Sequence, residues 1–179
     1  MHPTTLDILC AVSTAIVVVG AMFTDLRSRR IPNALTFTAF GVAVVVRLVF
    51  QGWSGLGLAL AGAALAPGVL LLIHLGRGLG MGDVKLAAAV GAFLGPMMAV
   101  AAMLCAAVIG GVLAIALLMR RGQLLSELLS LCLIGLPFVK VRKSIDPPAT
   151  SPADLTMPYG VAIGIGSLVT MAVYAWLGT

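Results

Sequence analysis

The chain has 179 residues, of which 61% are hydrophobic and only 9% are charged, and its formal net charge is +5. A soluble domain of average composition carries about 25% charged residues, so this composition excludes a domain with an ordinary water-facing surface. In lipid the backbone is satisfied only in helices or in a closed barrel. Long apolar runs without strict alternation favour helices. We therefore predict an all-α, polytopic membrane protein embedded in a lipid bilayer.

The first three spans are predicted from apolar runs and the breaks between them. The first run extends from about Ile8 to Thr24, and no Lys or Arg precedes it. Because a secretory signal peptide begins with a basic segment, we expect this span to be retained, with its N-terminus outside. Pro32-Asn33 favours the start of a second helix, from about Ala34 to Phe50. A third span is expected from about Leu56 to Leu75.

The apolar run from Leu86 to Met119 is too long for a single span. As one helix it would reach about 51 Å, against a hydrocarbon core of about 30 Å. Gly95-Pro96 offers a break, so we predict two short spans. Residues 123–137 are expected to form a helix in the membrane interface, with a re-entrant segment as the alternative. A Pro-rich loop follows, and the last span is predicted from about Tyr159 to Leu177.

The basic residues support about six spans with both termini on the outer face. In that topology ten of the eleven Lys and Arg residues lie in the cytosol, which explains the net charge without nucleic acid as a partner. Only Arg47 falls toward the outer side, where we expect it to extend to the interface. The ten cytosolic residues are Arg27, Arg29, Arg30, Arg77, Lys85, Arg120, Arg121, Lys140, Arg142 and Lys143.

The sequence indicates one domain and no metal or organic cofactor. The three cysteines, Cys10, Cys105 and Cys132, each stand alone in an apolar stretch. Without a CxxC pair, neither a zinc site nor a disulfide framework is indicated, and no organic cofactor is expected. We find no repeat and no boundary between domains, so residues 1–179 are predicted to form a single membrane-embedded domain.

Two acidic residues, Asp25 and Asp83, sit where a predicted span meets the cytosolic face. A carboxylate this close to lipid is costly without a partner or a function. Taken singly, Asp25 could pair with Arg27 or Arg29, and Asp83 could be the N-cap of its helix. Taken together, two close carboxylates share one proton and supply a general base and a general acid. Hydrolysis of a peptide bond is the reaction that such a pair favours.

The residues around Asp83 read Gly80-Met81-Gly82-Asp83-Val84-Lys85. Glycine lets another backbone approach closely, so an extended peptide could lie beside Asp83. Lys85 and the basic residues after Asp25 could bind an acidic group of that peptide, although anchoring at phospholipid explains them equally well.

Three motifs in this order resemble those of the type IV prepilin peptidases, a family of GxGD intramembrane aspartic proteases. Residues 80–85 match GxGDxK, and residues 25–33 (DLRSRRIPN) resemble the family's other aspartate motif. Residues 157–164 resemble the Pro-Tyr/Phe-Gly segment that opens the last span, with Val161 where many relatives have Pro, a difference from which we expect little effect. The resemblance implies a catalytic pair, Asp25 and Asp83, that cuts leader peptides from prepilins at the cytosolic side of the bacterial inner membrane. It implies supporting roles for Gly80, Gly82, Lys85, Arg27, Arg29, Asn33, Pro158 and Gly160.

Larger members of that family add a methyltransferase region held by paired cysteines, and we expect no separate methyltransferase domain here. The chain therefore resembles the short, Tad/CpaA-type form, whose substrates would be Flp-type prepilins and possible pseudopilins. Two other interpretations stay open. A presenilin-like or signal-peptide-peptidase-like protease would have its first aspartate inside a span. A small transporter, or a non-enzymatic membrane subunit for pilus or secretion assembly, would have polar residues near the middle of the bilayer.

Overall fold

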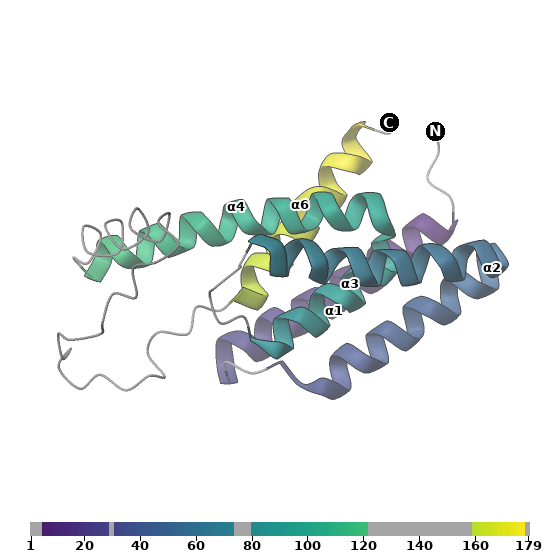
Figure 1. The fold of residues 1–179 in the computed structure, drawn as a ribbon, viewed down its shortest axis with the longest axis horizontal. Coiled ribbons are helices and arrows are strands. Elements are labelled where there is room, and N and C mark those ends of the chain that lie inside the picture. Colours follow the sequence, from purple (N-terminus) through teal and green to yellow (C-terminus); the bar gives the residue numbers. More distant parts are fainter. Residues whose placement is uncertain (1–4, 29–30, 74–79, 122–158, 178–179) are drawn as a thin grey trace, which may run out of the picture. The chain divides into compact units, whose positions relative to one another are not determined.

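The computed structural model describes residues 5–28, 31–73, 80–121 and 159–177. These ranges form the helices α1 (Thr5–Ser28), α2 (Asn33–Ile73), α3 (Met81–Leu94), α4 (Pro96–Arg121) and α6 (Tyr159–Leu177), shown in Figure 1. The prediction of an all-α protein is confirmed for this part of the chain. The predicted interfacial helix over residues 123–137, and the loop that follows it, lie outside the described residues.

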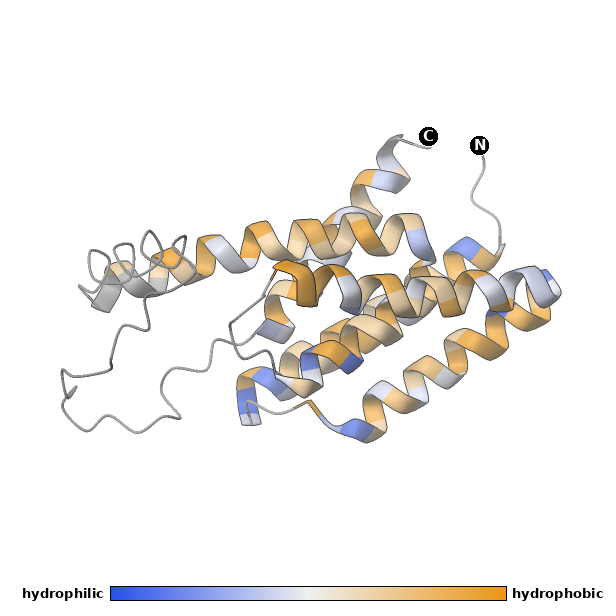
Figure 2. Ribbon diagram, viewed as in Figure 1, coloured by the Kyte–Doolittle hydropathy of each residue, from blue (hydrophilic) through white to orange (hydrophobic). Residues whose placement is uncertain are grey.

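Four of the described helices, α1, α2, α4 and α6, are long and apolar enough to cross a membrane. Figure 2 shows that most residues along these helices are hydrophobic, with hydrophilic residues at the end of α1 and at the starts of α2 and α3. The chain is therefore a membrane protein by the length and composition of its helices. Six spans, with both termini outside, remain a prediction.

The second and third predicted spans are the two arms of α2. Gly52, with φ 63° and ψ −146°, interrupts the helix between them. The arms run antiparallel in Figure 1. A methyl group on Gly55 would overlap the carbonyl oxygen of Arg47, so the two backbones touch just beyond the turn. The turn that separates these two predicted spans is therefore present in the structure.

The predicted break at Gly95-Pro96 is also present, and it leaves α3 unusually short. Gly95 has φ 78°, which glycine adopts without strain. With 14 residues, α3 is about 21 Å long, less than a hydrocarbon core of about 30 Å. It is not among the helices long enough to span by themselves. Its residues from Leu86 to Leu94 are instead buried, apart from the half-buried Ala88, because α3 packs against α1, α2 and α6.

The closest contact of α3 is with the second arm of α2. A methyl group on Gly62 would overlap the Gly91 carbonyl, and a methyl group on Gly91 would overlap the Gly62 carbonyl and crowd Ala66. Small residues at a helix interface allow such backbone contact, and van der Waals packing of this kind drives helix association in lipid. The two glycines therefore fix α3 directly against α2.

Arg47 holds the carboxyl end of α3. Its Nε lies 2.9 Å from the Ala92 carbonyl oxygen and its Nη2 lies 2.8 Å from that of Phe93. The last carbonyls of a helix lack intrahelical donors, and a cation there is favourable. With Arg47 only 8% exposed, the prediction that it extends to the membrane interface is wrong. Its guanidinium is a buried cap.

The chain divides into two compact units, residues 1–110 with 158–179, and residues 111–157. The first unit has a core of buried residues from all five helices, including Val18, Leu70, Leu86, Val90, Met103 and Ile163. In the second unit the structure describes only the last part of α4. The single membrane-embedded domain remains a prediction, and all residues considered below belong to the first unit.

Candidate active site

Asp25 lies in the last turns of α1 and is only 6% exposed. Its Oδ2 accepts a hydrogen bond of 3.0 Å from the backbone N–H of Gly160, and the N–H of Val161 also interacts with this carboxylate. Both amides belong to the first turn of α6, where N–H groups have no intrahelical acceptor. Within the described residues, Asp25 is thus paired with α6 rather than with Arg27.

Asp83 is the third residue of α3. The sequence also allowed Asp83 to be the N-cap of this helix, and the structure shows that it is not. Gly80 occupies the cap position, with φ −63° and ψ 131°, and its carbonyl accepts the Asp83 N–H at 3.0 Å. The Asp83 side chain folds back over Gly80. This is shown by its Oδ2, which would lie only 2.9 Å from a methyl group on that glycine. The carboxyl group of Asp83 therefore remains available for another role.

The two carboxyl groups interact with each other. The end of α1 and the starts of α3 and α6 lie together in Figure 1, and the three helices pack pairwise. Burial, and secondly the negative charge of Asp25, raise the pKa of Asp83 from 3.8 to about 6. Since like charges repel, the pair keeps one proton up to a pH of about 6, well above the usual range of an aspartate.

Ile31 fits between the two aspartate segments. Its Cβ would lie 3.3 Å from a methyl group on Gly82, and its Cδ1 would lie 3.2 Å from one on Gly160. Gly82 therefore lets the start of α3 approach the connection between α1 and α2. The sequence motif DLRSRRIPN contains Ile31, but its role in joining α3 to α6 depends on contacts that no local pattern reveals.

Lys85 and Asn33, two of the predicted supporting residues, are in direct contact. The Lys85 Nζ donates a 3.0 Å hydrogen bond to Asn33 Oδ1 and lies 5.2 Å from the centre of the Phe37 ring. Both partners belong to the start of α2, so the ammonium group connects α2 to α3 through a hydrogen bond and a cation–π contact. It has further donor capacity, because an ammonium group carries three N–H donors.

The remaining predicted site residues have no described contact with the two aspartates. Arg27 is exposed at the end of α1, and Arg29 and Pro158 lie outside the described residues. The sequence identifies Tyr159, the first residue of α6, only as part of a motif. Its hydroxyl would lie 3.0 Å from a methyl group on Gly110, so the ring packs on α4, and Asp83 is close enough to act on it electrostatically.

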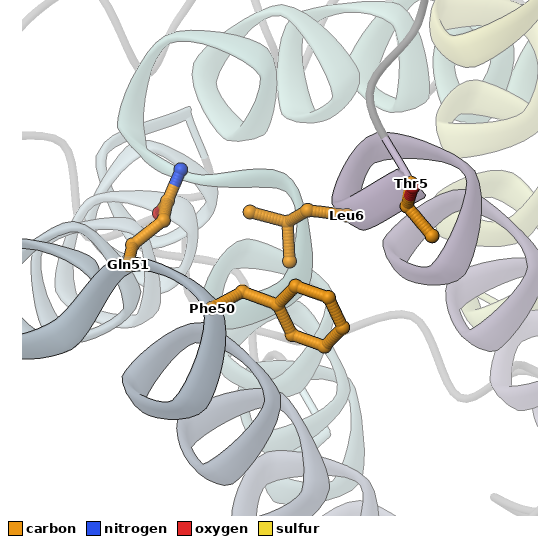
Figure 3. Close-up of a pocket in the computed structure, with 4 residues that line it drawn as sticks. All are labelled: Thr5, Leu6, Phe50 and Gln51. Carbon is orange, nitrogen blue, oxygen red and sulfur yellow. The ribbon is translucent and has the colours of Figure 1, made fainter.

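One pocket lies away from the carboxylates. It is lined by Thr5, Leu6, Phe50 and Gln51, has a volume of about 320 Å³, and is shown in Figure 3. Because Thr5 and Asp25 are near opposite ends of α1, this pocket is separated from the carboxylates by most of a helix. In the described part of the chain, no group of three or more His, Cys, Asp or Glu residues could hold a metal ion.

The sequence model of the type IV leader peptidase family matches residues 12–115, which include both aspartate motifs. Neither the search of curated proteins nor that of solved structures finds a match.

Proposed function

Because the chain belongs to the type IV leader peptidase family, we propose that it is a prepilin leader peptidase that uses Asp25 and Asp83 as its catalytic pair. The family supports peptidase activity. The observation that carries the assignment of the pair is the interaction between the two carboxyl groups, in which burial and the charge of Asp25 raise the pKa of Asp83 to about 6. A carboxyl group with a pKa close to the working pH is suited to proton transfer.

The reaction needs one carboxylate and one carboxylic acid. The carboxylate takes a proton from water as the water oxygen attacks the scissile carbonyl carbon, and the acid gives its proton to the carbonyl oxygen. In the second step the newly protonated carboxyl group protonates the amine nitrogen. The C–N bond then breaks, and the intermediate returns a hydroxyl proton to the other carboxylate. Water is consumed and both side chains regain their initial states.

The position of the pair at the helix ends supports the proposed substrate class. A prepilin combines a basic leader with an apolar helix, so its scissile bond would lie at the membrane surface. Asp25 is near the end of α1, a helix long enough to span a membrane, and Asp83 is near the start of α3. We infer that cleavage takes place at the cytosolic face of the inner membrane, where the distribution of Lys and Arg puts these ends. Flp-type prepilins are the proposed substrates.

Lys85 is proposed to assist substrate binding from a fixed position. Its contacts with Asn33 and Phe37 hold the ammonium group two residues beyond Asp83. An acidic side chain next to the scissile bond would share this ammonium group with the Asn33 amide oxygen. Arg27 and Arg29 are proposed to contribute positive charge to the same membrane surface.

Co-expression with a tagged Flp-type prepilin tests the proposal. Wild-type chain should shift the mobility of the prepilin, and Asp25→Asn and Asp83→Asn should each lower the cleavage rate by about 100-fold or more, because each removes a proton-transfer group. Asp7→Asn, a change near the other end of α1, should leave cleavage intact. Near-normal turnover by either active-site variant would refute the pair. An uncut prepilin with wild-type chain would favour a transporter or an assembly subunit.

A further inference from the structure

The two carboxyl groups of the proposed catalytic pair have different surroundings. Asp25 receives the N–H of Gly160 at 3.0 Å and interacts with the N–H of Val161. Burial acts on both carboxyl groups, but among the described residues no backbone N–H donates to that of Asp83. The pair is therefore chemically asymmetric before any substrate binds.

Amide donors distinguish an ionised carboxylate from a protonated one. Hydrogen bonds to the ionised form stabilise it, charge-assisted bonds are stronger than neutral ones, and the amino end of a helix attracts negative charge. We propose that the first turn of α6 decides which aspartate is ionised: the Gly160 and Val161 amides keep Asp25 as the carboxylate that activates water, and Asp83 carries the shared proton. The catalytic meaning of this assignment rests on the proposed function.

In the described residues, the other titratable and charged side chains at the end of α1 and at the starts of α3 and α6 are those of Arg27, Asp83, Lys85 and Tyr159. Arg27 is exposed, and Lys85 is engaged by Asn33 and Phe37. Neither cation donates to Asp25 in the described part of the chain. The Gly160 amide of α6 is thus its direct hydrogen-bond donor, and the Val161 amide also interacts with it.

Gly160 is a positioning residue in this arrangement, because a side chain at this position would crowd the Asp25 carboxylate. A methyl group at this position would lie 2.8 Å from Asp25 Oδ2 and 3.2 Å from Cγ. Even the smallest side chain would push the carboxylate away from the amide. Val161 contributes through its backbone alone, so a change that deletes its N–H tests the inference most directly.

Proline provides that change, since the first turn of a helix tolerates it. Val161 is the third residue of α6 and stands where many relatives have Pro. The sequence alone predicted little effect of this difference, whereas the inference predicts one, because Val161 has a backbone N–H that proline lacks. Val161→Pro removes the N–H, and Val161→Ala is the matched control that shortens the side chain but keeps the N–H. Both variants are assayed as full chains in detergent micelles with a synthetic Flp-type prepilin, and kcat/KM is measured against pH.

Val161→Pro should shift the acidic limb of the pH profile to higher pH by about half a unit or more, because an ionised carboxylate that loses a donor binds protons more readily. Val161→Ala should leave this limb in place. Identical acidic limbs for the two variants would overturn the inference, whereas the proposed function stands or falls with the Asp25→Asn and Asp83→Asn results.

A measurement of stability separates the donor from the proline ring without using activity. The Tm is measured for Val161→Pro and Val161→Ala in the wild-type chain and in the Asp25→Asn background. We expect the proline variant to melt below the alanine variant in the wild-type chain, and this gap to shrink by at least half when residue 25 cannot be ionised. An equal gap in both backgrounds would show that the ring, not the lost N–H, is responsible, and would overturn the inference.

Discussion

Replacing Arg47 by leucine should destabilise the protein strongly, although Arg47 is far from the proposed site. The substitution removes donors from two buried carbonyl groups, those of Ala92 and Phe93, at 2.9 Å and 2.8 Å. Interhelical hydrogen bonds in a membrane protein contribute about 0.6 kcal/mol on average and at most about 1.7 kcal/mol. Two lost bonds therefore predict a loss of about 1–3 kcal/mol.

The free energy of unfolding is measured by titrating mixed micelles with a denaturing detergent and following helicity by circular dichroism. Gln51→Ala is the matched control. It removes a partner 3.2 Å from the Arg47 Nη1 but leaves both carbonyl bonds, and Gln51 is exposed, so we expect a change below about 0.5 kcal/mol. If Arg47→Leu were as mild as this control, the account of Arg47 as the cap of α3 would be refuted.

Three further predictions concern packing, pH and substrate handling. Gly91→Ala should lower the free energy of unfolding by about 1–3 kcal/mol, because the new methyl group would overlap the Gly62 carbonyl. The control Gly57→Ala places its methyl group in open space and should leave the stability unchanged. Equal stabilities of the two variants would contradict the packing of α3 on α2. Because the pKa of Asp83 is raised from 3.8 to about 6 in the folded protein, the wild type should lose stability relative to Asp83→Asn as the pH rises through this window. The free energy of unfolding of both proteins, measured at both ends of the window, checks this expectation. A difference that stays constant would be the contrary result. Lys85→Ala should lower the cleavage rate less than either aspartate variant does. A complete loss of cleavage in this variant would show that Lys85 acts in the reaction itself.

The helical architecture was predictable because it depends on local composition. Apolar runs identify helices in lipid whatever they pack against, and glycines with positive φ occur where the predicted spans are separated, at Gly52 and Gly95. The enclosure of α3 was not predictable, since its apolar sequence suits either lipid or protein neighbours.

The site was predictable only in part. The two aspartates stood out because a carboxylate next to lipid is costly, but their hydrogen-bond donors are backbone amides, which every residue except proline possesses and which composition cannot identify. For the same reason the sequence suggested a surface role for Arg47, whose acceptors are carbonyls about 45 residues away. A local pattern also left Asp83 as a possible helix cap, a position that Gly80 occupies.

The contact between Gly62 and Gly91 limits how this protein can change over evolutionary time. Each position is blocked by the carbonyl group of the other, and a carbonyl group is present whichever amino acid is there. A larger residue at one position cannot be offset by a smaller one at the other, because neither has a side chain to give up. Compensation would require the helices themselves to separate, and α3 would then carry Asp83 away from Asp25.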